Sequence, residues 1–270
     1  MSDTSPVSLV CCDLVGTIAS DGGILEKAFT EAIATQGVVP GTAAYARSMV
    51  QVDRARGYPP RDVMHTLFSE DDARAQAVYL AFERSYCAVV DRFGITTVPG
   101  AQEAISSLSS SHVRVCLISG FSRATSGLVL DSLGVRRQVD LTLCLDDVPR
   151  GWPWPDAVLT AVIRLGIADV AEVAVVGDSE NVLIAGHRAG AGTLVGLSGA
   201  RTGERLRKAG ATHLIWTVAD LPELLLRTSE PVAAVGNDTA QEPPARDLPG
   251  YPRPGVVLPQ VPLRGKHAGL

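Results

Sequence analysis

The sequence predicts an α/β fold: a mostly parallel sheet with helices on both faces, and a small helical cap inserted after the first strand. Two observations predict this class. From Gly94 onward, short apolar runs alternate with helical patterns, and before it residues 21–93 have helical periodicity. Strands that alternate with crossover helices pair in parallel, and their helices then cover both faces of the sheet.

Each predicted strand is a short run rich in valine, leucine and isoleucine, which is typical of a strand buried on both faces. Each predicted helix has apolar residues at spacings of three and four. The expected strands are 7–12, 113–118, 139–145, 173–176, 193–197 and 213–216, and the expected helices after Gly94 are 123–133, 155–165, 181–189 and 204–209.

These elements divide the chain into three parts. The sheet and its helices make a core from residues 1–20 and 94–228. The cap takes residues 21–93, where Pro40-Gly41 and the glycine and prolines of 57–60 break the pattern into short helices. Residues 229–270 are rich in proline and glycine without periodicity, so we expect a disordered tail.

Composition narrows the class of protein. With 46% hydrophobic and 20% charged residues, the chain of 270 residues is typical of a globular protein. Its net charge of −5 argues against nucleic-acid partners. No run approaches a membrane span, the first residues do not resemble a signal peptide, and the five cysteines show no metal-ligand spacing. We therefore expect a cytoplasmic protein without a membrane partner, and the sequence is compatible with a homodimer.

The most informative local feature is Asp13. It follows an apolar strand and precedes Gly16, which allows a tight turn directly after the acid. Open α/β sheets bind ligands at the carboxyl ends of their strands, so Asp13 is placed to attack an electrophile or to hold a metal ion. The alternative is that Asp13 only caps a turn.

Three more polar turns follow predicted strands. Ser119-Gly120 has a hydroxyl and backbone amides at the start of a helix, which could hold a phosphate oxygen. Asp178 follows the strand 173–176 and could share a divalent cation with Asp13. The third turn is the run DDVPRGWPWP from Asp146, whose two acids we expect to have supporting roles in the turn.

In this order the chain resembles the haloacid dehalogenase superfamily, and within it the phosphonoacetaldehyde hydrolase (phosphonatase) branch, across residues 7–228. That branch has the patterns DxAGT, TTGYTRE, DDVPxGRPxP and GDT. The corresponding runs here are DLVGT at 13, ISGFSRA at 118, DDVPRGWPWP at 146 and GDS at 177.

The resemblance implies a Rossmann-like core, a helical cap, Mg²⁺ and an aspartate nucleophile that forms an acyl-phosphate intermediate. Asp13 matches the nucleophile, and Asp178 matches a metal ligand together with Asp13 and the backbone carbonyl of Val15. Ser119 matches the residue that binds the transferring phosphoryl group, and Thr17 closes the first motif. The implied activity is hydrolysis of a small phosphorylated or phosphonylated metabolite.

The chain departs from the family pattern at four positions. Val15 replaces the acid that protonates the leaving group in phosphatases of the superfamily, as an apolar residue does in phosphonatases. Asp53 stands where phosphonatase has its imine-forming lysine, so we predict that phosphonoacetaldehyde is not the substrate. Trp152 replaces the third-motif Arg or Lys, and Val182 replaces a second acid of the fourth motif.

Two neighbouring residues could compensate for these losses. Arg150 could supply a cation, and Asn181 could hold a metal-bound water, although a surface charge and a helix cap are the simpler interpretations. The sequence thus leaves two functions open: a Mg²⁺-dependent hydrolase that acts through Asp13, and a degenerate family member that binds a ligand or partner without turnover.

Overall fold

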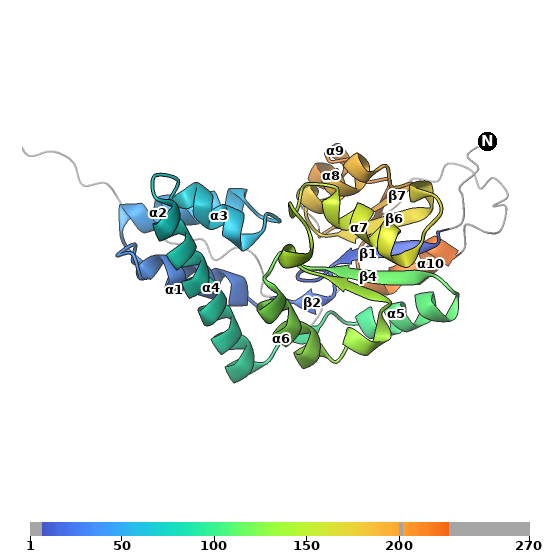
Figure 1. Cartoon of the computed structure of the whole chain (residues 1–270), viewed down its shortest axis with the longest axis horizontal. Helices are drawn as coiled ribbons and strands as arrows, with labels where there is room; N and C mark the ends of the chain where they lie inside the picture. Colours follow the sequence, from blue (N-terminus) through green and yellow to red (C-terminus); the bar gives the residue numbers. More distant parts are fainter. Residues whose placement is uncertain (1–6, 200–201, 227–270) are drawn as a thin grey trace, which may run out of the picture. The chain divides into compact units, whose positions relative to one another are not determined.

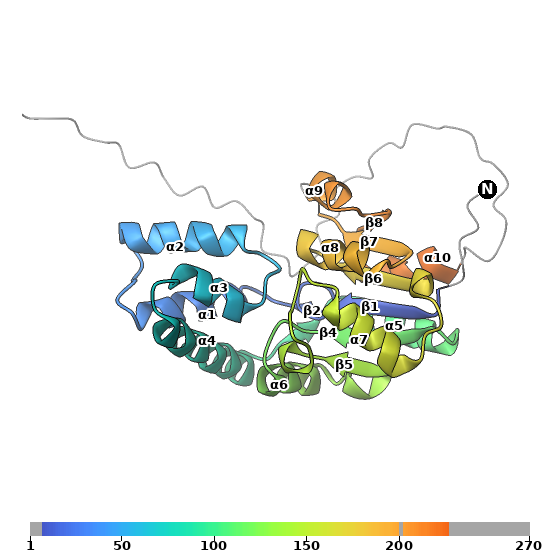
Figure 2. The same cartoon turned by 45° about the horizontal axis from the view of Figure 1, so that its top comes forward.

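The main sheet consists of parallel strands in the order β5-β4-β1-β6-β7-β8. The computed structural model describes residues 7–199 and 202–226. Figures 1 and 2 show β1 inside the sheet, between β4 and β6. The strands are β1 (Leu9–Asp13), β4 (Arg114–Ile118), β5 (Leu141–Leu143), β6 (Val173–Gly177), β7 (Thr193–Leu197) and β8 (His213–Ile215).

Helices cover both faces of this sheet (Figure 1). Strand β1 shows why: Leu9 and Cys11 pack into one apolar cluster with α7, α8 and α9, while Val10 and Cys12 pack into the other with α5, α6 and α10. The helices are α5 (Ala101–Ser110), α6 (Arg123–Leu133), α7 (Asp156–Leu165), α8 (Glu180–Ala189), α9 (Gly203–Lys208) and α10 (Leu221–Leu226). The predicted α/β class is confirmed.

A helical insertion separates β1 from the rest of the sheet. It comprises α1 (Ile24–Ala34), α2 (Ala43–Arg54), α3 (Pro60–Leu67) and α4 (Asp72–Phe93), which Figure 1 shows as one group. The predicted break at Pro40-Gly41 lies in the connection before α2; of the break at 57–60, residues 57–59 lie in the connection before α3 and Pro60 is the first residue of α3. A two-stranded antiparallel ribbon, β2 (Ala19–Ser20) with β3 (Thr96–Thr97), joins the chain entering the insertion to the chain leaving it.

Some expectations need correction or lie outside the described residues. Helices α5 and α10 and the β2-β3 ribbon were not predicted, and the strand expected at 139–145 is only Leu141–Leu143. The remaining short elements are single-turn 3₁₀ helices: η1 (Arg136–Gln138), η2 (Leu145–Asp147), η3 (Val170–Glu172) and η4 (Val218–Asp220). The predicted tail, 229–270, lies outside the described residues.

No helix in the described part of the chain is long and apolar enough to cross a membrane. The five cysteines are free thiols, and four of them are buried.

Candidate active site

Three of the predicted site residues lie at neighbouring strand ends. In the parallel register Asp13 is paired with Ile118, so Ser119 follows directly on one side of it. On the other side β6 ends at Gly177, and Asp178 follows. The fold therefore brings the side chains of Asp13, Ser119 and Asp178 to one edge of the sheet, as parallel topology requires.

Asp13 and Asp178 form an electrostatically coupled pair of carboxylates. Gly16 has a φ of 92°, and a Cβ atom there would overlap the Asp178 carboxylate, so this turn requires glycine. Burial raises the pKa of Asp13 well above its usual value, and the charge of Asp178 raises it further. Burial also raises the pKa of Asp178, to about 6, although Arg56 and its own backbone amide oppose the shift. By surface area, however, Asp13 is half-buried and Asp178 is exposed, so a ligand can reach both residues and solvent limits the effect of burial on Asp178.

Trp152 provides a direct hydrogen-bond partner for Asp13. Its indole Nε1–H donates to Asp13 Oδ1 at 3.2 Å, and this bond lowers the pKa of Asp13. The tryptophan is buried, with its ring in the apolar cluster under α7 and α8. A neutral donor therefore contacts the carboxylate from the position where the family pattern has a cation, a role that the sequence alone did not predict.

Ser119 has the geometry of an oxyanion donor. Its Oγ accepts hydrogen bonds from the Phe121 amide at 3.2 Å and from the Ser126 hydroxyl at 2.9 Å. Its own hydroxyl proton is not engaged by another residue of the described chain and can be donated to a ligand.

The amides at the start of α6 are less available than the sequence suggested. The amide of Ser122 donates to Glu83, and the amide of Arg123 donates to Asp146 at 2.7 Å. Within the described residues, the Ser119 hydroxyl and the Gly120 amide remain as donors in this turn.

The residues present fit a divalent cation in this turn. The described residues contain no group of three His, Cys, Asp or Glu side chains that could hold a metal. The ligands that the family resemblance implies are two carboxylates, Asp13 and Asp178, and the Val15 carbonyl, all of them oxygen donors that suit Mg²⁺. Beside them, the hydroxyls of Thr17 and Ser179 are buried and have no hydrogen-bond partner among residues 7–199 and 202–226. A cation would relieve the repulsion that raises the pKa of Asp13, and hydroxyls without partners are typical of a site that is completed by a ligand.

The two valines that replace acids have different settings. Val15 is half-buried beside Asp13 in the turn. Val182 is fully buried against Gly177 in the core, and a Cβ at Gly177 would overlap it. Val182, which stands where the fourth motif usually has an acid, is therefore a core residue that packs α8 against the sheet.

Asn181 contacts the helical insertion. Its side-chain amide donates to the backbone carbonyl of Arg56 at 3.1 Å. The next residue, Gly57, has a φ of 80°, and a Cβ atom there would overlap the side chain of Ser179. The sequence predicted neither Arg56 nor Gly57 as a site residue.

The other two candidates, Arg150 and Asp53, form ion pairs with residues close to them in the sequence. Arg150 forms two hydrogen bonds with Asp156, at 3.1 and 2.8 Å, and its guanidinium lies over the ring of Trp154. Among the described residues no hydrogen bond or ion pair links Arg150 to Asp13, and its pairing with Asp156 agrees with the simpler interpretation of a surface charge. Asp53 pairs with Arg56 at 3.4 Å, and both side chains are more than 70% exposed.

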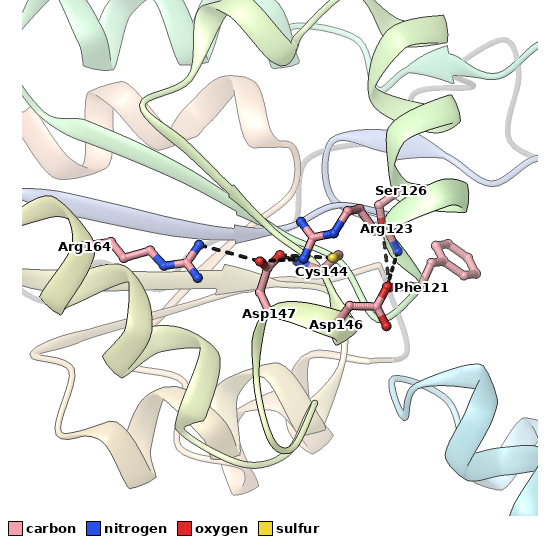
Figure 3. Close-up of polar contacts among 7 residues, drawn as sticks. All are labelled: Phe121, Arg123, Ser126, Cys144, Asp146, Asp147 and Arg164. Atoms are coloured by element: carbon pink, nitrogen blue, oxygen red, sulfur yellow. Dashed lines mark hydrogen bonds and ion pairs between the residues drawn. The ribbon is translucent and has the colours of Figure 1, made fainter.

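Asp146 and Asp147 support the loop that carries Trp152. Figure 3 shows Arg123 and Arg164 on either side of Asp147, with nitrogen–oxygen distances of 3.0 and 3.6 Å. Asp147 also accepts from the amide and thiol of Cys144, and these bonds lower its pKa despite its burial. Asp146 caps the start of α6 through the amide of Arg123. Neither acid faces the nucleophile in these contacts, in agreement with the expected supporting role.

Curated relatives match about half of the chain. It is 31% identical over 152 residues to the phosphonoacetaldehyde hydrolase of Pseudomonas fluorescens, which is 47% of this chain and 55% of that protein. It is 34% identical over 163 residues to the phosphonoacetaldehyde hydrolase of Bordetella pertussis, 51% of this chain and 58% of that protein. The chain thus matches little more than half the length of these relatives.

Solved structures cover more of the chain. A hydrolase from Pseudomonas syringae superposes with a TM-score of 0.69 at 25% identity, covering 82% of this chain and 98% of that one. A phosphonoacetaldehyde hydrolase-like protein from Oleispira antarctica superposes with a TM-score of 0.71 at 19% identity, covering 83% and 93%, which is a likeness of fold.

A family model, described as haloacid dehalogenase-like hydrolase, matches the part of the sequence that carries the site. It spans residues 7–190, more than half of the chain, and so includes Asp13, Ser119, Trp152 and Asp178. The chain therefore belongs to the family of haloacid dehalogenase-like hydrolases.

Proposed function

We propose that the chain is a Mg²⁺-dependent hydrolase that removes the phosphoryl group from a small phosphorylated or phosphonylated metabolite. The observation that carries this proposal is the position of Asp13, at the end of an internal strand and between Ser119 and Asp178. A cation held by Asp13, Asp178 and the Val15 carbonyl would neutralise charge on the carboxylates and the phosphate.

In the proposed reaction, a carboxylate oxygen of Asp13 attacks phosphorus while the bond to the leaving group breaks. The Ser119 hydroxyl donates to one of the phosphoryl oxygens, where negative charge is concentrated. Water then hydrolyses the acyl phosphate, which releases inorganic phosphate and regenerates Asp13. Asp13 is half-buried, so its carboxylate stays accessible to a substrate.

The turn restricts which leaving groups can depart. Val15 has no proton to give, and an alkoxide that leaves unprotonated is a poor leaving group. We therefore propose substrates whose leaving group is a stabilised anion, such as an acyl or enol oxygen. The proposed substrates do not include phosphonoacetaldehyde. Its cleavage needs a lysine that forms an imine, and the chain has Asp53 at the position of that lysine.

The test is phosphate release from a panel of small phosphate esters, acyl phosphates and phosphonates with Mg²⁺, in the wild type and in Asp13→Asn. Release that requires both Mg²⁺ and Asp13 supports the proposal. If nothing in the panel is hydrolysed, and beryllofluoride with Mg²⁺ does not stabilise the wild type against heat, the proposal fails.

A degenerate binding protein is the second candidate, and Trp152 favours it. The only direct side-chain donor to Asp13 in the described structure is neutral, whereas transition-state charge is commonly stabilised by a cation at such a position. This candidate predicts that beryllofluoride or phosphate binds with Mg²⁺ while no substrate is turned over. The cytoplasmic location and a homodimer stay predictions from the sequence.

A further inference from the structure

The connection between α2 and α3 is seated on the strand-end turns of the candidate active site. Besides the contact of Asn181 with the Arg56 carbonyl, Pro59 packs against two glycines: a Cβ on Gly120 would contact Pro59, and a Cβ on Gly151 would overlap its ring. Pro59 itself is buried. Residues 55–59, which we name the insertion loop, thus contact the turns after β4 and β6 and the loop that carries Trp152.

This loop places an arginine beside the candidate metal site. The Arg56 carbonyl accepts from Asn181 at 3.1 Å, and Gly57 lies against the side chain of Ser179. Both contacts are with residues that follow Asp178 within three positions, so Arg56 is anchored next to a carboxylate that would hold the metal ion.

Other arginines near the sheet edge are already bound. Asp156 engages Arg150, and Asp147 engages both Arg123 and Arg164. Within the part of the chain that the structure describes, the Arg56 side chain in contrast has one ion pair, to Asp53 at 3.4 Å, and it is 78% exposed. Its guanidinium can leave Asp53 at little cost, since exposed ion pairs contribute little to stability.

We propose that Arg56 is the phosphate-binding cation of this site, in place of the residue that Trp152 has replaced, and that Asn181 is the positioning residue that holds the Arg56 backbone over the site. This inference rests on the proposed function. A guanidinium can donate two parallel hydrogen bonds to phosphate oxygens, which suits an anion bound at Asp13. The cation then comes from the helical insertion and reaches the substrate only while the insertion loop is seated, so binding of the anion and closure of the insertion are coupled.

The test is calorimetric titration with two probes, Mg²⁺ alone and inorganic phosphate at saturating Mg²⁺. The proteins are the wild type, Arg56→Gln, Arg56→Lys, Asn181→Ala and the double variant Arg56→Gln/Asn181→Ala. Arg54→Gln is the matched control, because Arg54 is an exposed arginine at the end of the same helix, α2.

We expect opposite effects on the two probes. Arg56→Gln weakens phosphate binding about two- to fivefold, the range for an exposed charge pair, and leaves Mg²⁺ binding equal or tighter because a repelling charge is gone. Arg56→Lys retains part of the phosphate affinity, and Arg54→Gln changes neither. Asn181→Ala weakens phosphate binding, and the double variant is no weaker than Arg56→Gln, because both changes remove the same contact.

Other results overturn the inference. If Arg56→Gln alters neither affinity, or weakens both, Arg56 is a solvated charge or a structural residue. If Asn181→Ala weakens Mg²⁺ binding, Asn181 belongs to the metal site and is not a positioning residue. Should the wild type bind both probes without Asp13-dependent turnover, the hydrolase proposal fails while this inference is still decided by the titrations; a wild type that binds neither probe overturns both.

Discussion

The indole Nε1 of Trp152 lies 3.2 Å from Oδ1 of Asp13 and donates a hydrogen bond to it, although 139 positions separate the two residues in the sequence. The bond favours the ionised form of Asp13, and it opposes the burial and the Asp178 charge that favour the protonated form. Trp152 therefore stabilises the ionised form of Asp13, as a cation would, although its indole is neutral.

Replacing Trp152 with phenylalanine removes this donor and keeps a large ring in the core. Because the bond lowers the pKa of Asp13, its loss raises that pKa, and the acid limb of the pH profile for phosphate release moves to higher pH. We expect the folded protein to lose about 1 kcal/mol as well. Trp216→Phe is the control, since Trp216 is 64% exposed; equal acid limbs in the two variants would contradict this role for Trp152.

Asp178→Asn is expected to stabilise the metal-free protein at neutral pH. Folding raises the pKa of Asp178 from 3.8, the ordinary value for an aspartate, to about 6, so the folded chain binds the proton more tightly than the unfolded chain. Its contribution to stability is complete below about pH 4, falls as the pH rises to about 6, and is constant above that. Because Asp178 is partly open to solvent, we expect a gain on the order of 1 kcal/mol for the variant at pH 7.

Urea unfolding at pH 4.5 and pH 7, with and without Mg²⁺, tests this prediction. Mg²⁺ should stabilise the wild type and have little effect on Asp178→Asn. Asp91→Asn, an exposed position on α4, is the control for the loss of one negative charge. A variant that is less stable than the wild type at pH 7 without metal would show that Asp178 has a structural role.

Apolar periodicity predicted many helices and strands of the core, because each of these elements is formed by residues that are close together in the sequence. Helix α6 has the predicted bounds, and so does strand β7. Helix α5 was missed because the serines from Ser106 to Ser110 resemble a loop, although Ala101, Ala104, Ile105 and Leu108 form a buried face at helical spacing. Burial of that face against the sheet outweighs the weak helix propensity of serine.

The candidate site also has a part that the sequence predicted and a part that it did not. Asp13, Ser119 and Asp178 could be placed from the sequence, because the carboxyl ends of parallel strands meet at one edge. The Asn181 contact with Arg56 spans 125 positions, and the Trp152 contact with Asp13 spans 139. Such contacts depend on how loops pack against one another, and the periodicity of the sequence gives no information about that packing. For the proposed role of Arg56, the signal in the sequence was the missing third-motif cation, which prompts a search for a cation elsewhere in the chain.

Glu83 is expected to be the main polar joint between the insertion and the core. From α4 its carboxylate accepts hydrogen bonds from Tyr79, from the amide and hydroxyl of Ser122, and from the Thr125 hydroxyl at 2.7 Å. Glu83→Gln keeps the shape but turns an amide group toward these donors, so we expect a loss of about 1–3 kcal/mol in the free energy of unfolding. Urea titration measures it, with Glu103→Gln as the exposed control; equal stability of the two variants would contradict the prediction.

Phosphonoacetaldehyde is expected to form no imine with this protein. Of the three lysines, Lys27 lies over the ring of Phe93 and Lys208 pairs with Glu204, while Lys266 lies outside the described residues. Incubation with the aldehyde and sodium borohydride, followed by mass spectrometry, should show no reduced adduct beyond that of the urea-unfolded chain. An adduct that forms only with the folded protein and is lost in one Lys→Arg variant would contradict this prediction. It would show that a lysine of this chain forms an imine, as in phosphonatase.

Val15→Asp is expected to widen the range of leaving groups. An acid two residues after Asp13 can protonate an alkoxide as it departs, a contribution that is typically about 10²–10⁴-fold in rate. We expect a smaller gain, about tenfold or more, with alkyl phosphates such as glycerol phosphate, because Val15 is half-buried and a third carboxylate is placed beside Asp13 and Asp178.

The measurement is the slope of the logarithm of the rate against leaving-group pKa, over acyl, aryl and alkyl phosphates. The wild type should give a steep negative slope, and Val15→Asp a flatter one, since a proton donor removes the penalty of a basic leaving group. Val15→Asn has nearly the same shape without the acid, and it should keep the steep slope. A flat slope in the wild type would mean that another group already protonates the leaving oxygen, and Asp21 would then be the first residue to substitute, because burial raises its pKa and its charge acts on Asp178.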